Sequence, residues 1–398
     1  MNQMDIPQGW KKLKLKDILD EGSKEKVKDI SKYQKLTIKL NFKGVEKAKV
    51  RENMADKRPF YVRKKGEIVI GKQNYFNGSI AILPEELDGG ICSNAIMSFI
   101  TKKDFNNKYV YYMLSDINFI NKRSFLANGT GQKELSEKDF LDFDVIIPRI
   151  EEQEKIVKIL ENLDFIINKL NKEIIENEKI IEYIFNTAIK RYKTESIKIK
   201  KIVEYKKGYA FKSKEYKNKG CRVIRVSDLG EKYIKDECEK IFIDEFQKNI
   251  FQDYELKEND LIITTVGSKP PIYSSVAGRV IRVDKYHDGC LLNQNTVRLR
   301  TDKKILPRIL YYQLRTKKYY DYLDVIMRGN ANQGNITIAE LLDYEVKIIN
   351  QDLQIKLEKV LENIENTVLY KNEKIKQYEK LKTSLMQQLL TGKVRVKI

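Results

Sequence analysis

The chain has 398 residues, and its 76 Lys and Arg against 57 Asp and Glu give a formal net charge of +19. This excess of positive charge favours a polyanionic partner such as nucleic acid. The codon usage of an AT-rich genome is an alternative source of part of the Lys count. Its length allows two or three domains. The sequence has no apolar run near the roughly 20 residues of a membrane span and no signal peptide, so we expect a cytoplasmic protein without membrane contact. One His and four scattered Cys argue against a His-based triad, a zinc site or a disulfide framework.

The first 150 residues contain short β-type runs separated by turn residues. Four of these runs predict strands, at Glu67–Ile70, Ile80–Leu83, Ala95–Ile100 and Asp144–Ile147. Helical segments such as Lys108–Leu114 lie among them. This mixture predicts a compact α+β domain over residues 1–150.

A long helix is predicted next, over residues 151–193, because Pro148 is a favourable residue just before a helix start. Apolar residues then follow alternating steps of four and three, interrupted once by Asn177. This heptad seam predicts burial against another helix. The seam positions are Ile156, Leu160, Leu163, Ile167, Leu170, Ile174, Asn177, Ile181, Ile184 and Ala188.

The same two parts recur in the second half of the chain. Strands are predicted at Arg222–Val226, Leu261–Thr265, Arg279–Val283 and Thr296–Leu299, with a helix at Pro307–Leu314, so residues 194–349 form a second α+β domain. Residues 350–398 carry a second long helix. Its seam comprises Leu357, Leu361, Ile364, Val368, Lys371, Ile375, Tyr378, Lys382, Leu385 and Leu389.

Local sequence matches show that the two halves are copies of one unit. Five matches occur in the same order at offsets between 193 and 201, which chance would not readily produce. The matched pairs are Gly66–Ile70 with Asn259–Ile263, Tyr111–Leu114 with Tyr311–Leu314, Gln132 with Gln333, Gln153 with Gln354, and Leu160–Leu163 with Leu361–Ile364.

The two seams are natural partners for each other. Because a globular domain separates the two helices in the chain, we expect an antiparallel pair with the α+β domains at its two ends and a pseudo-twofold relation between the repeats. The alternative is that the helices form a dimer interface between two chains. Duplex DNA has a matching approximate twofold symmetry, so the architecture predicts an asymmetric bipartite DNA site whose gap is set by helix length.

The chain resembles the specificity subunit of a type I restriction–modification system over almost its whole length. The motifs that carry the resemblance are Ile6–Trp10, Lys207–Phe211, Val223–Leu229, Leu292–Val297, Gly129–Gln132, Glu152–Ile156 and Leu385–Lys393. The resemblance implies two target-recognition domains, at 1–150 and 194–349, and two conserved spacer helices, at 151–193 and 350–398. It also implies a subunit without catalysis or cofactor that organises two methyltransferase subunits binding S-adenosylmethionine and can recruit two ATP-driven restriction subunits. We expect Leu385–Lys393 to contact these partners.

The competing hypothesis is an enzyme with a fused methyltransferase or nuclease activity. A methyltransferase of this kind needs an Asn/Asp-Pro-Pro-Tyr/Phe motif. The one Pro-Pro pair lies in Lys269–Ile272 and lacks both the leading amide or acid and the trailing aromatic residue. A phosphate-binding Gly-x-x-x-x-Gly-Lys-Ser/Thr loop is also missing from the sequence.

Polar loops bordered by glycine are the best candidates for DNA contact, because amide and basic side chains read base edges and neutralise phosphates. The alternative is that these residues only stabilise their own loops. The candidates are Lys72, Gln73, Asn74, Thr130, Gln132, Lys133, Lys206, Lys207, Tyr209, Lys212, Thr265, Ser268, Lys269, Arg328, Asn330, Asn332, Gln333 and Asn335.

Overall fold

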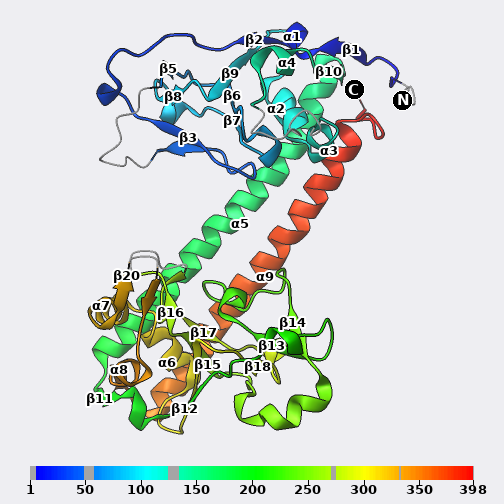
Figure 1. Cartoon of the computed structure of the whole chain (residues 1–398). Coiled ribbons are helices and arrows are strands. Elements are labelled where there is room, and N and C mark those ends of the chain that lie inside the picture. Colours follow the sequence, from blue (N-terminus) through cyan, green and yellow to red (C-terminus); the bar gives the residue numbers. More distant parts are fainter. Residues whose placement is uncertain (1–5, 49–57, 124–133, 270–274, 331–332, 398) are drawn as a thin grey trace. The chain divides into compact units, whose positions relative to one another are not determined.

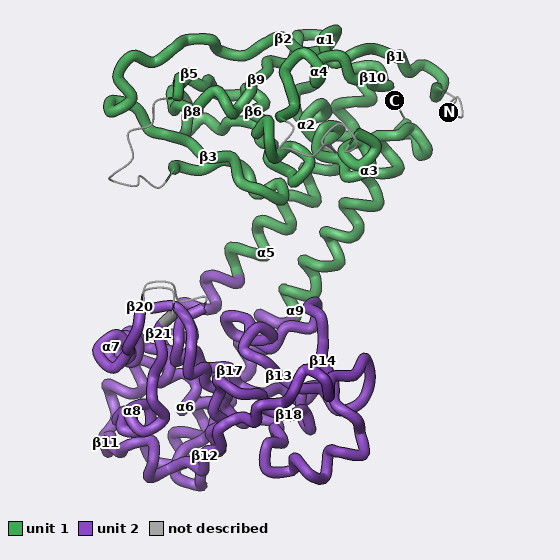
Figure 2. The backbone as a smooth tube through the Cα atoms, in the orientation of Figure 1, with its two compact units in different colours: residues 1–173, 370–398 green, residues 174–369 purple. Residues whose placement is uncertain are grey.

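The structure is a computed structural model that describes residues 6–48, 58–123, 134–269, 275–330 and 333–397. The chain divides into two compact units (Figures 1 and 2). Unit 1 combines residues 1–173 with residues 370–398, and unit 2 is the continuous stretch 174–369.

Unit 1 is built around a four-stranded sheet. Its strands lie in the order β2 (Leu19–Glu21), β9 (Ile96–Thr101), β6 (Ile68–Gly71) and β7 (Ile80–Ile82). Smaller strand pairs and short helices surround it. These are β1 (Lys11–Lys14) with β10 (Asp144–Ile147), β3 (Leu36–Ile38) with β4 (Val45–Lys47), β5 (Phe60–Val62) with β8 (Ile91–Ser93), and the helices α1 (Leu15–Ile18), α2 (Asn107–Ser115), α3 (Ile117–Asn121) and α4 (Glu137–Leu141).

Unit 2 repeats this plan. Its four-stranded sheet has the order β12 (Val203–Lys207), β19 (Thr296–Thr301), β15 (Leu261–Thr264) and β17 (Val280–Arg282). The other elements are β11 (Glu195–Lys198) with β22 (Glu345–Ile348), the sheet β14 (Ile241–Ile243), β13 (Cys221–Ile224) and β18 (Leu291–Leu292), the sheet β16 (Val266–Gly267), β21 (Gln333–Asn335) and β20 (Arg328–Asn330), the helices α6 (Pro307–Gln313), α7 (Lys317–Ile326) and α8 (Ile338–Leu342), and the 3-10 helix η8 (Glu245–Tyr254).

The strand register confirms the internal duplication. Ile68 of β6 pairs with Phe99 of β9, and Leu261 of β15 pairs with Leu299 of β19. The offsets between these equivalent residues are 193 and 200, the same as between the matching sequence motifs. The fold is therefore the predicted α+β class, present twice.

One inner strand of each sheet, β6 in unit 1 and β15 in unit 2, is mainly apolar and fully buried because both of its faces are covered. In β6, Ile68 and Ile70 belong to the core shared with α2 and the long helices, while Val69 packs on the opposite side with Leu36 and Ala81. Such a strand forms a continuous apolar run instead of an alternating one.

Two long helices complete the units. They are α5 (Ile150–Arg191, 42 residues) and α9 (Gln351–Leu389, 39 residues). Every predicted seam position on both helices is buried or half-buried, which confirms the heptad interpretation.

Within unit 1 the helices run antiparallel. Nζ of Lys371 lies 3.0 Å from a carboxylate oxygen of Glu173, and Nζ of Lys382 lies 2.5 Å from a carboxylate oxygen of Asp164. Partners that rise in number on one helix and fall on the other require antiparallel chains. The two Lys residues that interrupt the apolar seam of α9 are thus neutralised by acids of α5.

Asn177 interrupts the seam of α5 inside unit 2. Its Nδ2 is buried and has no hydrogen-bond partner among the described residues. The burial favours an inward-facing Asn over a solvent-facing one.

The apolar side chains of Leu385–Lys393, the segment expected to contact partner subunits, pack within unit 1. Leu389 and Leu390 are buried in the core of unit 1, and Leu385 and Met386 pack against it. These apolar side chains close their own unit, while Gln388, Thr391 and Lys393 of the same segment are exposed.

A buried glutamine joins each long helix to its α+β domain in the same way. Oε1 of Gln153 accepts the Asn106 N–H at 2.8 Å, and its Nε2 donates to the Pro148 carbonyl at 2.9 Å. Oε1 of Gln354 accepts the Leu306 N–H at 2.8 Å, and its Nε2 lies 2.9 Å from the carbonyls of both Lys304 and Ile349. The sequence match between the two glutamines is therefore a structural equivalence.

Candidate nucleic-acid interface

The candidate interface lies at one end of each four-stranded sheet, which we call the loop end. In unit 1 it is where β6 finishes and β9 begins. The Lys72 N–H donates to the Ala95 carbonyl at 3.0 Å, and the Leu135 N–H donates to the Lys72 carbonyl at 3.1 Å. Three chain segments far apart in sequence thus meet at Lys72.

Unit 2 has the same junction at Thr265. The Thr265 N–H donates to the Asn295 carbonyl at 2.8 Å, and the Ile336 N–H donates to the Thr265 carbonyl at 3.0 Å. Offsets of 193, 200 and 201 relate these residues to those of unit 1. The loop end is therefore a repeated feature of the fold.

The predicted candidates in unit 1 project from this junction. Gln73 and Asn74 are exposed, whereas the ammonium of Lys72 is 19% exposed and lies 3.4 Å from the carboxylate of Glu137. The main chain of Asn74 precedes a short 3-10 turn, Tyr75–Asn77, so this loop is firmly held. Two exposed amides on a fixed loop suit hydrogen bonding to base edges.

In unit 2 the structure brings two predicted loops together into one small sheet. β16 pairs with β21, which in turn pairs with β20. Helix α7 ends just before this ribbon and helix α8 begins just after it, so both strands are anchored in the core. The described candidates of these two loops, from Thr265 to Lys269 and at Arg328 and Asn335, thus belong to one small sheet and its flanks.

Close packing underlies this ribbon. A Cβ added to Gly267 would lie 2.3 Å from the Ser275 carbonyl oxygen, and one added to Gly334 would lie 2.5 Å from Sδ of Met327. Ser268 is buried, and its hydroxyl lies 2.8 Å from that of Ser275. Ser268 is consequently placed to hold the ribbon rather than to contact a ligand.

Arg328 and Asn335 are the exposed described candidates on the ribbon. They stand opposite each other in the antiparallel register of β20 and β21. Nη2 of Arg328 donates to Oε1 of Glu340 at 2.7 Å. The neighbouring Lys269 is half-buried.

A second group of candidates follows β12. The Tyr209 N–H donates to the Leu292 carbonyl at 3.0 Å, and the Gln294 N–H donates to the Tyr209 carbonyl at 2.8 Å, so this segment also borders the loop end. Tyr209 packs against Phe211 and Phe251, with ring centroids 5.0 and 4.9 Å away. This cluster gives Tyr209 a packing role.

The Lys residues of this group differ in their surroundings. Nζ of Lys206 lies 2.7 Å from a carboxylate oxygen of Asp253 and 4.9 Å from the ring centroid of Tyr254. Lys207 and Lys212 are exposed. The charge of Lys206 is therefore neutralised within the chain, while the other two remain available to phosphates.

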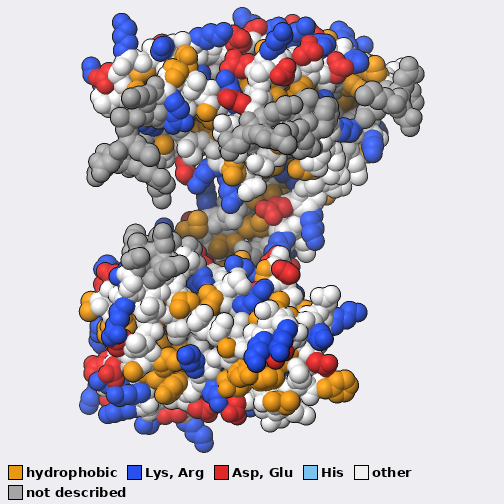
Figure 3. All heavy atoms as spheres, in the orientation of Figure 1, with side chains coloured by type: hydrophobic (Ala, Val, Ile, Leu, Met, Phe, Trp, Pro, Cys, Tyr) orange, Lys and Arg blue, Asp and Glu red, His pale blue; other side chains and the backbone are white. Residues whose placement is uncertain are grey.

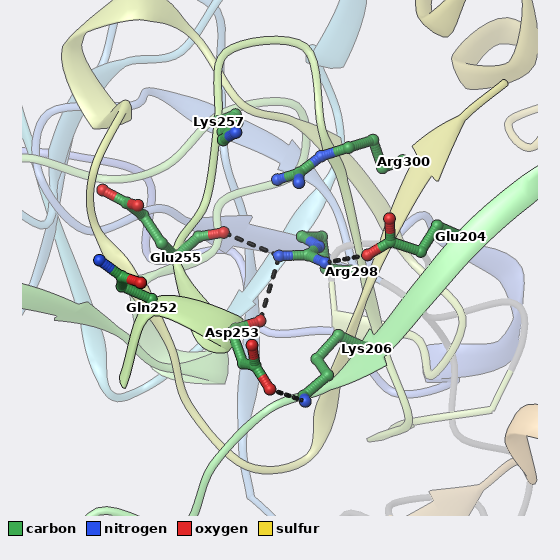
Figure 4. A pocket seen from close by; sticks show the side chains of 8 residues that line it. All are labelled: Glu204, Lys206, Gln252, Asp253, Glu255, Lys257, Arg298 and Arg300. Atoms are coloured by element: carbon green, nitrogen blue, oxygen red, sulfur yellow. Dashed lines mark hydrogen bonds and ion pairs between the residues drawn. The ribbon is translucent and has the colours of Figure 1, made fainter. Parts of the chain in front are cut away.

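A polar hollow of about 510 Å³ lies beside Lys206 (Figure 4). It is lined by Glu204, Lys206, Gln252, Asp253, Glu255, Lys257, Arg298 and Arg300. Nη2 of Arg298 donates to Glu204 at 2.7 Å, and Arg300 forms a bidentate pair with Asp260 at 2.8 and 2.7 Å. Because both guanidinium groups already bind carboxylates, their charge is used in ion pairs within unit 2 and is not presented to a ligand.

Two exposed amides at the loop end were missed by the sequence prediction. Gln294 and Asn295 form the turn before β19, and the Asn295 carbonyl is bonded to Thr265. The turn is tight, since a Cβ on Gly208 would lie 1.8 Å from the Asn293 oxygen. Their Asn-Gln-Asn sequence was the available signal, because amides cluster where base edges are read.

Some predicted candidates cannot be placed. Thr130, Gln132, Lys133 and Asn332 lie outside the described residues. For Asn330 and Gln333 the structure gives the backbone, in which the two residues pair with each other.

Charge is spread over the molecule. On the face seen in Figure 3, Lys and Arg side chains are interspersed with Asp and Glu on both units. Among the described residues, no group of three or more His, Cys, Asp or Glu is arranged to hold a metal ion. The described helices include none with the length and apolar character of a membrane span.

Comparisons with known proteins agree with this architecture. Residues 7–178 match the family described as the type I restriction modification DNA specificity domain. The type I restriction enzyme MjaVIII specificity subunit of Methanocaldococcus jannaschii is 25% identical over 353 residues, covering 83% of this chain and 77% of the relative.

Two solved structures share the fold. The type I restriction–modification system S subunit from M. genitalium superposes with a TM-score of 0.57 at 14% identity, over 100% of this chain and 99% of that one. A chain from a study of assembly and conformational transition in the type I R-M system gives a TM-score of 0.52 at 16% identity, over 98% and 100%. The matched domain and the relative make the chain similar to type I restriction–modification specificity subunits, and the two solved structures share its fold.

Proposed function

We propose that this chain is the non-catalytic DNA sequence-recognition subunit of a type I restriction–modification complex. The observation that carries the proposal is the repeated loop end, which each unit builds from three distant segments and lines with exposed amide side chains. Two copies of one recognition surface in one chain suit two half-sites on a duplex.

The two loop ends carry different residues, so the two half-sites differ. Unit 1 presents Gln73 and Asn74 beside Lys72, whereas unit 2 presents Asn295 and the β20–β21 ribbon beside Thr265. Different donors and acceptors select different base edges. The proposed target is therefore an asymmetric bipartite sequence in duplex DNA.

In this proposal residues 1–150 and 194–349 are the two target-recognition domains. Residues 151–193 and 350–398 are the spacer helices, and their length sets the gap between the half-sites. Removing one heptad from each helix is expected to change the gap and to leave both half-sites unchanged. A changed half-site with an unchanged gap would contradict this division of labour.

The proposed partners are two methyltransferase subunits that bind S-adenosylmethionine and, in complexes that cleave DNA, two ATP-driven restriction subunits, all in the cytoplasm. Exposed apolar side chains on the long helices support protein docking there. In unit 1 these include Phe165, 68% exposed, and Tyr370; in unit 2 they include Tyr183, 71% exposed, and Leu369. Solvent-facing residues of this size on a helix favour burial against a partner.

Docking on the helices can be tested by substitution. Phe165→Glu should weaken co-purification of the methyltransferase subunit, while Phe246→Glu, at a 92% exposed residue of η8, serves as the matched control. Equal loss in both variants, or in neither, would argue against the helices as the docking surface.

The function is tested by mapping methylated adenines in cells with and without this chain. We expect methylation at one bipartite sequence that disappears with the chain. DNA binding by the complex with the methyltransferase subunits should fall steeply with salt, because phosphate neutralisation releases counterions. Methyl transfer from S-adenosylmethionine by the purified chain alone would instead support the enzyme hypothesis.

A further inference from the structure

The β20–β21 ribbon of unit 2 has one polar face and one closely packed face. Arg328 pairs with Asn335, and Gly329 pairs with Gly334. Directly opposed residues of an antiparallel pair lie on the same face. Gly334 faces crowded surroundings, since a Cβ there would meet Met327 at 2.5 Å, whereas Arg328 and Asn335 are exposed. β16 pairs with the other side of β21, so β20 with Arg328 is an edge strand of this small sheet and is the strand that can approach the major groove of DNA.

Arg328 is exposed, but its guanidinium is held in place. The Arg328 side chain is 67% exposed, and its Nη2 donates to Oε1 of Glu340 at 2.7 Å. An unrestrained Arg side chain loses much rotamer entropy when a ligand fixes it. The ion pair removes part of this freedom before any ligand binds.

Glu340 is itself fixed by the start of helix α8. Its second carboxylate oxygen accepts the Thr337 hydroxyl at 2.5 Å, and the Glu340 N–H donates to the same hydroxyl at 3.2 Å. The Glu340 carbonyl accepts the Tyr322 hydroxyl at 2.6 Å, and Leu341 is fully buried. The carboxylate is thus a rigid support on a packed helix.

The chemistry of this pair favours base edges over phosphates. A carboxylate beside the guanidinium offsets its charge and so weakens its attraction to a phosphate. It occupies one of five N–H donors and leaves a fork that matches O6 and N7 of guanine. Resting on the proposed function, we propose that Arg328 contacts a guanine of the second half-site and that Glu340 is the positioning residue that orients it.

The test uses the whole chain in complex with its methyltransferase subunits. Binding is measured by competition with duplexes in which each base pair of the two half-sites is varied in turn, and methylated adenines are mapped in parallel. Arg328→Ala should lose about tenfold to a hundredfold discrimination at one G·C pair of the second half-site, as expected for a bidentate contact. Arg328→Lys should lose the same discrimination, because an ammonium lacks the fork.

Glu340→Gln is the decisive variant. It retains an oxygen for Thr337 but removes the charge, so we expect discrimination to fall several-fold at the same G·C pair, with the first half-site unchanged. Asp139→Asn is the matched control, because Asp139 makes the equivalent cap with Ser136 at the start of α4 in unit 1. It should leave the second half-site unaffected.

Four results would overturn the inference. Arg328→Ala that weakens binding equally for all sequences and lowers the salt slope by about one identifies a phosphate contact instead. Full discrimination in Glu340→Gln denies it a positioning role, and tighter specific binding there identifies a masking role. Loss of discrimination spread over both half-sites indicates general misfolding. By contrast, an unsubstituted complex without sequence preference would overturn the proposed function as well.

Discussion

The two buried glutamines offer a quantitative test of the duplicated architecture. Gln354 satisfies three main-chain groups of unit 2, and Gln153 satisfies two of unit 1, with both side chains at most 1% exposed. Substitution by Leu keeps nearly the same volume. The cost therefore comes from main-chain groups left buried without a hydrogen bond rather than from a cavity.

The magnitude follows from the number of bonds lost. A buried group left unpaired costs about 1–3 kcal/mol, and because several of these bonds are only partly buried we take the low end, about 1–1.5 kcal/mol for each. We expect Gln354→Leu to destabilise unit 2 by about 3–4.5 kcal/mol and Gln153→Leu to destabilise unit 1 by about 2–3 kcal/mol. The ratio of the two effects is a sharper prediction than either value, because it depends only on the count.

Native-state hydrogen exchange, which measures local opening free energies, is the appropriate assay for a chain of two units. Protection should fall around Leu306 in the first variant and around Asn106 in the second. Gln388→Leu, at an exposed position of α9, is the control. The reasoning is refuted if Gln354→Leu costs no more than this control, or if Gln153→Leu costs more than Gln354→Leu.

Three further predictions concern unit 2. Tyr312→Phe removes a 2.6 Å hydrogen bond to Glu365 and should cost about 1.5 kcal/mol by hydrogen exchange; an unchanged value would contradict a structural role for that bond. The buried guanidinium of Arg308 lies within 3.6 Å of three glutamates of α9. Arg308→Met removes it and should lower the stability of unit 2 by about 3 kcal/mol. An unchanged stability would show that solvent replaces the guanidinium. The ammonium of Lys200 is hydrogen-bonded to Asp343 and lowers the pKa of that carboxyl. The pair's contribution to folding stability is therefore present above the unfolded pKa of about 3.9 and is lost as the pH falls through the lowered folded pKa. Carboxyl NMR titration should show the pKa of Asp343 rising in Lys200→Met, and no rise would refute the pairing.

Much of the fold followed from the sequence because its signals are local. The strands predicted at Ile80–Leu83 and Asp144–Ile147 correspond to β7 and β10 within one residue, and the helix predicted at Lys108–Leu114 corresponds to α2. Apolar runs and heptad spacing report burial directly, and the repeat offsets reappeared in the strand register.

The candidate site was less predictable because its chemistry depends on distant partners. Lys206 is neutralised by Asp253, and Tyr209 is packed against Phe251, both more than 40 residues away. Composition gives no sign of either contact. In the same way, the buried end of α9 at Leu389 looks like an exposed apolar surface until the core of unit 1 is known.

The contact between Glu340 and Arg328 was likewise not predictable from the sequence. In the sequence it is one acid among many, following Thr337 by three residues, and it predicts only a helix cap. Its contact with Arg328 depends on the return of the chain through the ribbon, which no local pattern encodes.

The discontinuous construction of unit 1 has a consequence for biosynthesis. Unit 2 is one uninterrupted stretch, whereas the core of unit 1 joins Ile156 and Leu160 with Leu389 and Leu390. At about 5–20 residues per second, the ribosome needs roughly 10–45 s to get from one part of this core to the other. During that interval an apolar face of the nascent chain stays uncovered while unit 2 emerges. The first unit to be started is therefore the last to be completed, and chaperones have a defined target in the meantime.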